Sequence, residues 1–237
     1  MFKKRLTSFS QNIFSKIENS IQIIHPSKGC QDQREEGESQ PSRDEAPVLG
    51  IRFYTEYPLC NYACEYCIAF STKSQKRLKR WREKGKANYL SIVQALINMP
   101  YAIDVRIGVG EFFIDKTLID GARQLSVARN CVAVNLITNL SFPFQQYLSF
   151  LKDFDLSKVA IIASYHDTQI KDRQEWLETA ERMNGLVDFA IAVVAWPPIL
   201  KRLAEIKKMF EERGLYVFMQ AFQGLYEGKK FPESYSG

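Results

Sequence analysis

Histidine and long apolar runs are scarce in this chain of 237 residues. It contains only 2 histidines, which leaves few ligands for a metal site built on imidazole. No apolar segment approaches the roughly 20 residues that a membrane-spanning helix needs. Lys3, Lys4 and Arg5 are followed by no continuous apolar stretch, so we expect neither a secretory signal nor a membrane span, and we expect a cytoplasmic location.

The sequence also lacks a strong charge of either sign. Its formal net charge is +5 and its basic residues are dispersed, so the composition argues against a nucleic-acid partner. Cysteine is sparse, with 5 in the whole chain. In a reducing compartment cysteines do not form a disulfide framework, and a tight cluster of them indicates a metal site or a catalytic site.

The N-terminal residues have the pattern of an amphipathic helix, because apolar side chains recur at steps of three and four. These side chains are Phe2, Leu6, Phe9, Ile13, Ile17, Ile21 and Ile24. We expect a helix over residues 1–24 that either docks on its own domain or contacts a partner protein or a membrane surface. Residues 25–46 are polar, charged and rich in glycine, proline and serine, which predicts a flexible linker.

Residues 47–237 show a different, alternating pattern. Six strand-like runs are separated by amphipathic helical patterns, which predicts parallel strands joined by right-handed crossovers and hence an α/β domain. The runs are VLGIRFYTEY, DVRIGVGEF, CVAVNLITNL, VAIIASYH, DFAIAVVAW and LYVFMQAF. The last helical pattern begins with two prolines and places four apolar residues on one face, namely Leu200, Leu203, Ile206 and Phe210.

Alternation within the strands favours a barrel over an open sheet. One set of alternate residues is apolar, and it includes Ile51, Phe53, Val105, Ile107, Val134, Leu136, Ile161 and Ala163. The other set is polar, and it includes Arg52, Tyr54, Glu56, Asp104, Arg106, Asn135, Asn139, Ser164 and His166. A doubly wound sheet is apolar on both faces, whereas a barrel can enclose a polar interior. Because six units are too few for an eight-stranded barrel, we predict an open-sided, partial (β/α)6 TIM-like barrel.

Three cysteines, Cys60, Cys64 and Cys67, lie together in the loop after the first predicted strand. Thiolates are soft ligands, and three of them on one short loop can hold one metal centre. Three protein ligands leave a coordination position for chemistry, by the logic that separates catalytic from structural zinc sites. Cys131 begins the third strand at the opposite end of the barrel, so we do not expect it to be a fourth ligand.

The stretch CNYACEYC, placed after a first strand, resembles the cluster motif of the radical S-adenosylmethionine (radical SAM) enzymes, C-x3-C-x-aromatic-C. The resemblance covers the chain from Val48 to its C-terminal end. It implies that Cys60, Cys64 and Cys67 bind a [4Fe-4S] cluster and that S-adenosylmethionine chelates the fourth iron. Tyr66 matches the aromatic position, whose ring packs beside the adenine of the cofactor.

Other segments resemble further motifs of this family. GVGEFF is similar to Gly-Gly-Glu-Pro with Gly110 and Glu111 in register, which implies that both receive the ammonium of the cofactor; an N-cap is the alternative role for Glu111. ITNL is similar to Thr-Asn-Gly with Leu140 in place of glycine, which implies that Asn139 contacts the cofactor. Ser164 lies where family members place a further polar contact to S-adenosylmethionine.

Four polar residues are candidates for a substrate pocket, and no catalytic residue is assigned. They are Glu56, Arg106, His166 and Gln220. A buried ion-pair network with Arg52 is the alternative for Glu56 and Arg106. His166 is equally compatible with a structural hydrogen bond at a strand end.

The resemblance implies a soluble oxidoreductase. An electron donor such as flavodoxin or ferredoxin would drive reductive cleavage of S-adenosylmethionine, and the 5′-deoxyadenosyl radical would abstract hydrogen from a small polar molecule or a peptide. Two other interpretations stay open: a non-catalytic zinc-binding module, and an accessory subunit that depends on a partner docked on the N-terminal helix.

Overall fold

The computed structural model describes residues 48–67 and 84–235. The predicted N-terminal helix and linker, residues 1–24 and 25–46, lie outside the described residues. The elements are β1 (Leu49–Leu59), α3 (Lys86–Ile97), β2 (Ile103–Gly110), η4 (Phe112–Ile114), α4 (Lys116–Val127), β3 (Cys131–Thr138), α5 (Phe144–Phe150), η5 (Leu156–Lys158), β4 (Val159–Tyr165), α6 (Arg173–Asn184), β5 (Asp188–Ala195), η6 (Pro197–Arg202), α7 (Leu203–Glu211), β6 (Val217–Ala221), β7 (Gly224–Tyr226) and β8 (Lys229–Phe231).

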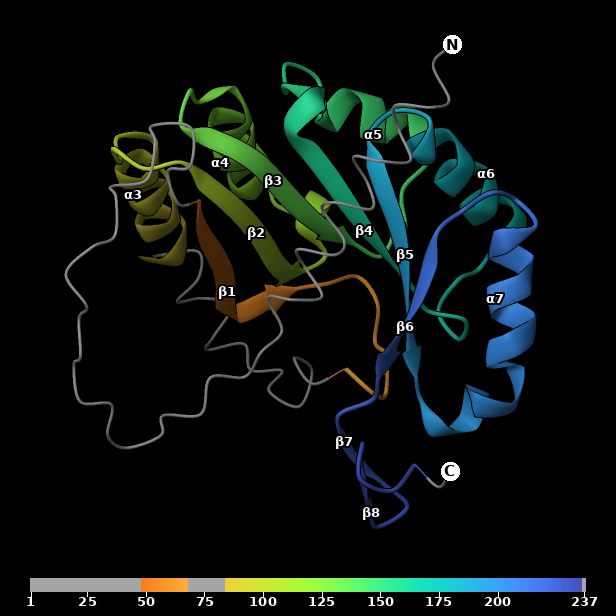
Figure 1. The fold of residues 1–237 in the computed structure, drawn as a ribbon. Helices are drawn as coiled ribbons and strands as arrows, with labels where there is room; N and C mark the ends of the chain where they lie inside the picture. Colours follow the sequence, from red (N-terminus) through yellow and green to blue (C-terminus); the bar gives the residue numbers. More distant parts are fainter. Residues whose placement is uncertain (1–47, 68–83, 236–237) are drawn as a thin grey trace, which may run out of the picture. The chain divides into compact units, whose positions relative to one another are not determined.

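Strands β1 to β6 form one curled parallel sheet (Figure 1). Neighbours in the sheet are also neighbours along the chain, and each pair is parallel. Helices α3 to α7 cover the outer face of this sheet, and the inner face is concave (Figure 1). The predicted partial (β/α)6 barrel is therefore confirmed, with a strand at each of the six predicted runs.

The outer face of the sheet forms the hydrophobic core. In the middle strands, the alternate residues predicted to be apolar are each at most 1% exposed, namely Val105, Ile107, Val134, Leu136, Ile161 and Ala163. Burial of apolar surface is the main favourable contribution to folding, at about 25 cal/mol per Å². It also fixes the register of each strand, because a slip of one residue would turn the apolar set toward the interior. The polar set therefore lines the concave face.

The last helix begins later than predicted. Residues Pro197–Arg202 form a 3-10 segment, and the α-helix begins only at Leu203. Two successive prolines supply no backbone N–H and restrict the residues before them, which delays the α-helical hydrogen bonds. As a result Leu200 is 37% exposed, whereas Ile206 and Phe210 are buried against the sheet.

The C-terminal segment contains an antiparallel hairpin, β7–β8, that was not predicted. Its turn residues Glu227 and Gly228 both have positive φ, 48° and 73°. Two such residues give the twist that a two-residue hairpin requires. Strands of only three residues are too short for their alternation to be recognised in the sequence.

Cys131 begins β3 and is buried at the end of the strand opposite to the loop of Cys60, Cys64 and Cys67, as predicted. All four of these cysteines are free thiols, so no disulfide links cysteines within the described part of the chain. Within the same residues, no helix has both the length and the apolar character needed to cross a membrane.

Helices α3 and α4 approach closely at Gly121, which faces the buried ring of Tyr89. A Cβ at position 121 would lie 2.8 Å from both Cζ and Oη of Tyr89, closer than such atoms can stand. The ring cannot move freely, because its hydroxyl donates a hydrogen bond to the backbone oxygen of Leu118 at 3.1 Å. Glycine is therefore required here by packing.

We predict that Gly121→Ala lowers the free energy of unfolding by about 1–3 kcal/mol, the usual effect of overpacking a core. Denaturant unfolding measures it. Gly50→Ala is the matched control, since a Cβ there meets nothing within 4 Å, and its effect should stay within about 0.5 kcal/mol. Equal midpoints for the two variants would contradict the close approach of the helices.

Candidate functional site

The cysteine loop, residues 60–67, leaves the C-terminal end of β1. Cys64 is buried, while Cys60 and Cys67 are half-buried. The backbone N–H of Cys67 donates to the carbonyl of Cys64 at 3.1 Å, and the N–H of Tyr62 donates to Sγ of Cys60 at 3.4 Å. These bonds fold the loop on itself at the edge of the sheet where the active faces of parallel barrels lie.

The surroundings of Cys64 and Cys60 favour the protonated form of these two thiols. Burial, together with smaller effects of the neighbouring Cys67 and Cys60, raises the pKa of Cys64 to about 11. The pKa of Cys60 is raised by burial as well, with a smaller increase from Glu111 and then from Cys67. The thiols are therefore close enough to disfavour one another's charge. A metal centre binds such thiols by displacing their protons.

Asn139, directly after β3, holds the cysteine loop against the sheet. Its Nδ2 donates to Oδ1 of Asn61 at 2.8 Å and lies 3.7 Å from Sγ of Cys60. Its Oδ1 accepts a hydrogen bond from the N–H of Ser141 at 3.1 Å. The side chain is 3% exposed, so in this structure Asn139 positions the loop.

Three residues that the sequence analysis missed also support the loop. Asn61 accepts the bond from Asn139, and Gln169 accepts a hydrogen bond from the N–H of Ala63 at 3.0 Å. Trp176 in α6 donates from Nε1 to the carbonyl of Asn139 at 3.0 Å. These partners are far apart along the chain, and no local pattern in the sequence marks them.

His166, which follows β4, contacts the cysteine loop directly. Its Nδ1 lies 3.3 Å from Sγ of Cys64 and 2.7 Å from the hydroxyl of Tyr66. The ring of Tyr66 stacks on the imidazole at 5.8 Å, and Tyr62 meets it edge-on at 5.7 Å. Burial lowers the pKa of His166 to about 4, so the ring is neutral at neutral pH. The structure thus places His166 beside the thiol of Cys64, and its role in a substrate pocket stays a prediction.

An aromatic wall, formed by Tyr66, Trp196, Tyr226 and Tyr235, adjoins the loop. The indole of Trp196 lies 5.3 Å from the ring of Tyr66 and 4.8 Å from that of Tyr226 in β7. The hydroxyl of Tyr235 donates to the carbonyl of Ala195 at 2.6 Å, which fastens the C-terminal segment to the end of β5. The hairpin is therefore part of the site's surroundings.

Glu111 is completely buried, and its carboxylate joins the ends of β2 and β3. Oε1 accepts hydrogen bonds from the N–H of Phe113 at 3.1 Å and from Oγ1 of Thr138 at 2.8 Å. Oε2 accepts from the N–H of Asn139 at 2.5 Å. Glu111 is thus the N-cap of η4, which was its alternative role. Its contact with the ammonium group of a cofactor stays a prediction.

Two backbone conformations match the glycines of the resembled motifs. Gly110 has φ 68° at the end of β2, in the left-handed region that favours glycine. Leu140 has φ 54°, although the motif places glycine there and a branched side chain is strained in this region. The backbone N–H of Leu140 donates to Oγ1 of Thr138 at 3.0 Å, and the side chain is buried. The hydrogen bond and the burial of the side chain stabilise this strained turn.

The remaining candidates are dispersed over the inner face. Arg106 and Ser164 are half-buried on β2 and β4, and Gln220 is exposed on β6. The sheet order separates Gln220 from Arg106 by four strands, so the structure does not bring these two together. Glu56 belongs to β1, but its side chain lies outside the described residues. Arg52 is exposed on β1, and the alternative of an ion-pair network that joins Arg52, Glu56 and Arg106 stays a prediction.

The three thiols fit a thiolate-bound cluster by their chemistry and their mutual electrostatic influence. Among the side chains of residues 48–67 and 84–235, no group of three potential ligands is close enough to hold a single metal ion.

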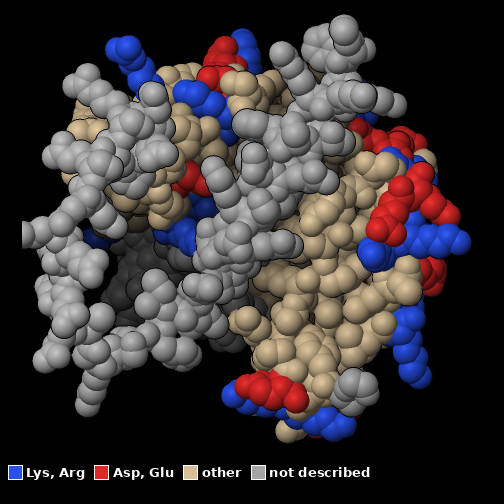
Figure 2. Space-filling view, in the orientation of Figure 1, with Lys and Arg blue, Asp and Glu red and all other residues tan. Residues whose placement is uncertain are grey.

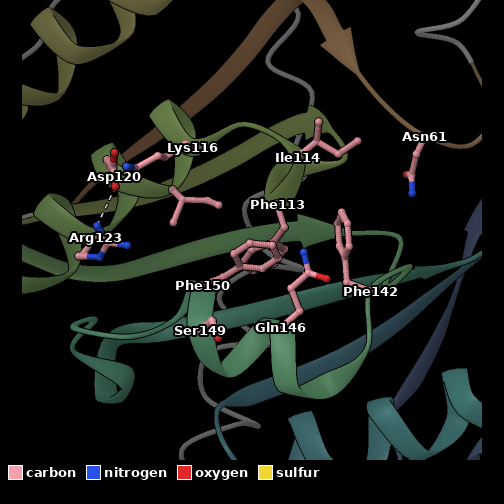
Figure 3. Close-up of a pocket in the computed structure, with 11 residues that line it drawn as sticks. Asn61, Phe113, Ile114, Lys116, Asp120, Arg123, Phe142, Gln146, Ser149 and Phe150 are labelled. Carbon is pink, nitrogen blue, oxygen red and sulfur yellow. Dashed lines mark hydrogen bonds and ion pairs between the residues drawn. The ribbon is translucent and has the colours of Figure 1, made fainter.

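A cavity of about 670 Å³ lies on the outer side of the sheet, between η4, α4 and α5 (Figure 3). Figure 3 shows the rings of Phe113, Phe142 and Phe150 around it. Its charged residues Asp120 and Arg123 form an ion pair with each other at 2.7 Å. None of the three loop cysteines lines this cavity.

Comparison with known proteins supports the fold. No protein-family model matches the chain, and no curated protein matches it. The structure is similar to the crystal structure of SuiB from Streptococcus suis, with a TM-score of 0.51 and 14% sequence identity. The match covers 78% of this chain and 42% of SuiB, so this chain spans less than half the length of that protein. At this identity the similarity is one of fold.

We predict that Glu111 makes stability depend on pH. Burial raises its pKa from 4.5 to about 7, although the hydrogen bonds from Asn139, Thr138 and Phe113 oppose the shift. The folded protein then keeps a proton that the unfolded chain releases. The resulting stabilisation is complete below the unfolded pKa and is lost as the pH rises through about 7.

Denaturant unfolding at about pH 5 and about pH 8 measures this effect. The wild type should lose about 2.5 kcal/mol more than the Glu111→Gln variant over this interval, because glutamine does not titrate. Parallel pH profiles for the two proteins would contradict the assignment.

Proposed function

We propose that this chain is a radical SAM enzyme that acts on a polar organic or peptide substrate. When bound, a [4Fe-4S] cluster supplies the electron that splits S-adenosylmethionine and yields a 5′-deoxyadenosyl radical for hydrogen abstraction. The observation that carries this proposal is the loop of Cys60, Cys64 and Cys67 at the C-terminal end of the first strand of a parallel partial barrel. The similarity to SuiB supports the fold that the proposal needs.

In this proposal the three cysteines hold the cluster, and the residues around them position the loop. Asn139 ties the loop to β3 through Asn61. A ligand set fixed by hydrogen bonds from neighbouring side chains is a common feature of metal sites. An electron donor such as flavodoxin or ferredoxin is the partner that the chemistry requires, and a reducing, cytoplasmic environment suits the thiols.

The cofactor would bind beside the loop on the inner face. Tyr66 presents an aromatic ring for the adenine, and the exposed backbone at Gly110 offers a carbonyl oxygen for the ammonium group. Ser164 and Asn139 add polar groups at the ends of β4 and β3. The aromatic wall around Trp196 shields this edge from water, which protects a reactive intermediate.

Substitution of the cysteines tests the proposed function. We predict that Cys60→Ala, Cys64→Ala and Cys67→Ala each abolish the acid-labile sulfide and the visible absorbance of protein reconstituted without oxygen. Each should also abolish the release of 5′-deoxyadenosine from S-adenosylmethionine, because no ligand replaces the lost thiolate.

Cys131→Ala is the matched control, since Cys131 is also a buried free cysteine but lies at the other end of its strand. It should retain sulfide and activity. Zinc without sulfide in the wild-type protein would favour the zinc-binding alternative, and activity in any of the three loop variants would refute the ligand assignment.

His166 gives a prediction about the cluster's reduction potential. An imidazole that carries its proton on Nδ1 can donate to the sulfur of Cys64, and such bonds stabilise the reduced cluster. His166→Phe keeps a ring but removes the donor, so the midpoint potential should fall by about 60 mV, or about 1.4 kcal/mol for one electron. A redox titration followed by electron paramagnetic resonance measures this. An unchanged potential with full iron and sulfide content would contradict the role.

A further inference from the structure

We propose that Asp167 is a positioning residue for the cysteine loop, because it anchors the turn of residues 166–170 that supports this loop. The inference adds a residue to the site of the proposed function, and it rests on that function for the role of the loop as a ligand set. It is carried by the hydrogen bonds that join the turn to the cysteine loop, and by the ion pairs that join the turn to α6 and η6.

The turn of residues 166–170 contacts the cysteine loop at two places. Nδ1 of His166 lies 3.3 Å from Sγ of Cys64. Oε1 of Gln169 accepts a hydrogen bond from the backbone N–H of Ala63 at 3.0 Å. The backbone N–H of Gln169 donates to the carbonyl of His166 at 2.8 Å, which closes the turn. Both contacts therefore come from one compact unit, and a displacement of the turn changes both of them.

Asp167 fastens this turn to the elements outside the sheet. Its Oδ1 accepts hydrogen bonds from the hydroxyl of Tyr165 at 2.9 Å and from Nη2 of Arg173 at 2.8 Å. Its Oδ2 accepts a hydrogen bond from Nη1 of Arg202 at 2.7 Å. Arg173 begins α6 and Arg202 ends η6. One carboxylate thus joins the end of β4 to both of these segments.

The Asp167 side chain is only 10% exposed, so its ion pairs are screened less than pairs between fully hydrated groups, which contribute little to stability. Burial alone would raise the pKa of Asp167. Hydrogen bonds from Tyr165 and Arg202, together with the charges of the two arginines, outweigh burial and lower this pKa below its usual range. The carboxylate is therefore ionised at neutral pH and can bind both guanidinium groups.

The anchor and the contact with the cysteine loop lie on opposite sides of the chain. Tyr165 is buried in the core outside the sheet, where its ring meets two other aromatic rings edge-on. Successive side chains of a strand point to opposite faces, and His166 reaches Cys64 on the other side. Asp167 bonds to the hydroxyl of Tyr165 and so holds the backbone from outside. Because Asp167 adjoins His166, loss of this anchor moves the backbone that carries the imidazole.

A change of Asp167 to asparagine leaves the two arginines without their shared negative partner. The neutral amide of Asp167→Asn offers one acceptor oxygen where the carboxylate offered two. Arg173 and Arg202 then repel each other, since no negative charge separates them. We expect the turn to open, so that His166 loses its contact with the cysteine loop.

Nuclear magnetic resonance of the imidazole rings tests this inference in the full-length protein, before any cluster is reconstituted. The chain has only 2 histidines, so selective labelling of histidine gives two sets of ring signals, and His166→Phe identifies those of His166. In the wild type we expect magnetisation transfer between the rings of His166 and Tyr66, because they stack at 5.8 Å. Asp167→Asn should remove this transfer and shift the His166 signals.

Arg202→Gln is a second, milder variant, because it removes one ion pair and leaves the other. It should shift the His166 signals in the same direction by a smaller amount. The side chain of Arg202 is 42% exposed, so this change leaves the core intact and provides a folded variant even where Asp167→Asn does not fold.

Glu181→Gln is the matched control. Figure 2 shows acidic and basic side chains close together over α6 and α7, and Glu181 forms another ion pair on this side, with Arg213 at 2.6 Å. This pair lies near the opposite end of α6 from Arg173. Glu181→Gln should leave the His166 signals at their wild-type positions. The unfolding midpoint is measured for each variant, so that a loss of stability alone is separated from a displacement of the imidazole.

The reduction potential provides a second measurement in protein that holds a [4Fe-4S] cluster. Asp167→Asn should lower the midpoint potential in the same direction as His166→Phe. The double variant should show no further fall than His166→Phe alone, because both changes remove the same hydrogen-bond donor from Cys64. Additive falls would contradict an action of Asp167 through His166.

Wild-type His166 signals in the Asp167→Asn and Arg202→Gln variants would overturn the inference, as would equal shifts in the Glu181→Gln control. Absence of transfer between His166 and Tyr66 in the wild type would equally contradict the geometry. The ring signals require neither cluster nor cofactor cleavage. Their failure is therefore distinguishable from failure of the proposed function, which is measured by sulfide content and by the release of 5′-deoxyadenosine.

Discussion

A buried carboxylate at the ends of two strands is the constraint on which the candidate site depends. Glu111 accepts hydrogen bonds from Thr138 and from the backbone of Asn139, and so fixes the end of β3 relative to β2. Asn139 then reaches the cysteine loop through Asn61 and approaches Cys60. A buried acceptor left without its donors destabilises the fold by about 1–3 kcal/mol. This energetic cost favours the intact set of hydrogen bonds from Glu111 through Asn139 to Asn61. These hydrogen bonds fix the position of the cysteine loop.

The curled sheet separates two tasks between its faces. The outer face is apolar and supplies the stability, with core residues such as Ile107 and Leu136 fully buried. The inner face does not form the hydrophobic core, so it can carry charged groups such as Arg52 and Asp104. Because side chains alternate along a strand, each strand contributes to both faces. The packing of one face thereby fixes the geometry of the other.

The C-terminal hairpin extends the site beyond the sheet. Tyr235, four residues after the hairpin, fastens the C-terminal segment to the end of β5, and Trp196 contacts both Tyr226 of the hairpin and Tyr66 of the cysteine loop. Aromatic contacts of this kind contribute about 0.5–1.5 kcal/mol each beyond area burial. The loop is thus held from both sides, by the hydrogen bond from Asn139 after β3 to its own residue Asn61 and by the aromatic wall at the end of β5.

The sequence by itself determined the strand order of the barrel, because apolar alternation and alternating helices leave one economical arrangement of parallel strands. It also determined which thiols share a loop, since Cys60, Cys64 and Cys67 are close along the chain. Only the tertiary structure decided that Glu111 is buried beneath Thr138, that His166 meets Cys64, and that Gln169 supports the loop. These contacts join residues on different strands, and their distances depend on the curl of the sheet, which no local pattern of side chains encodes.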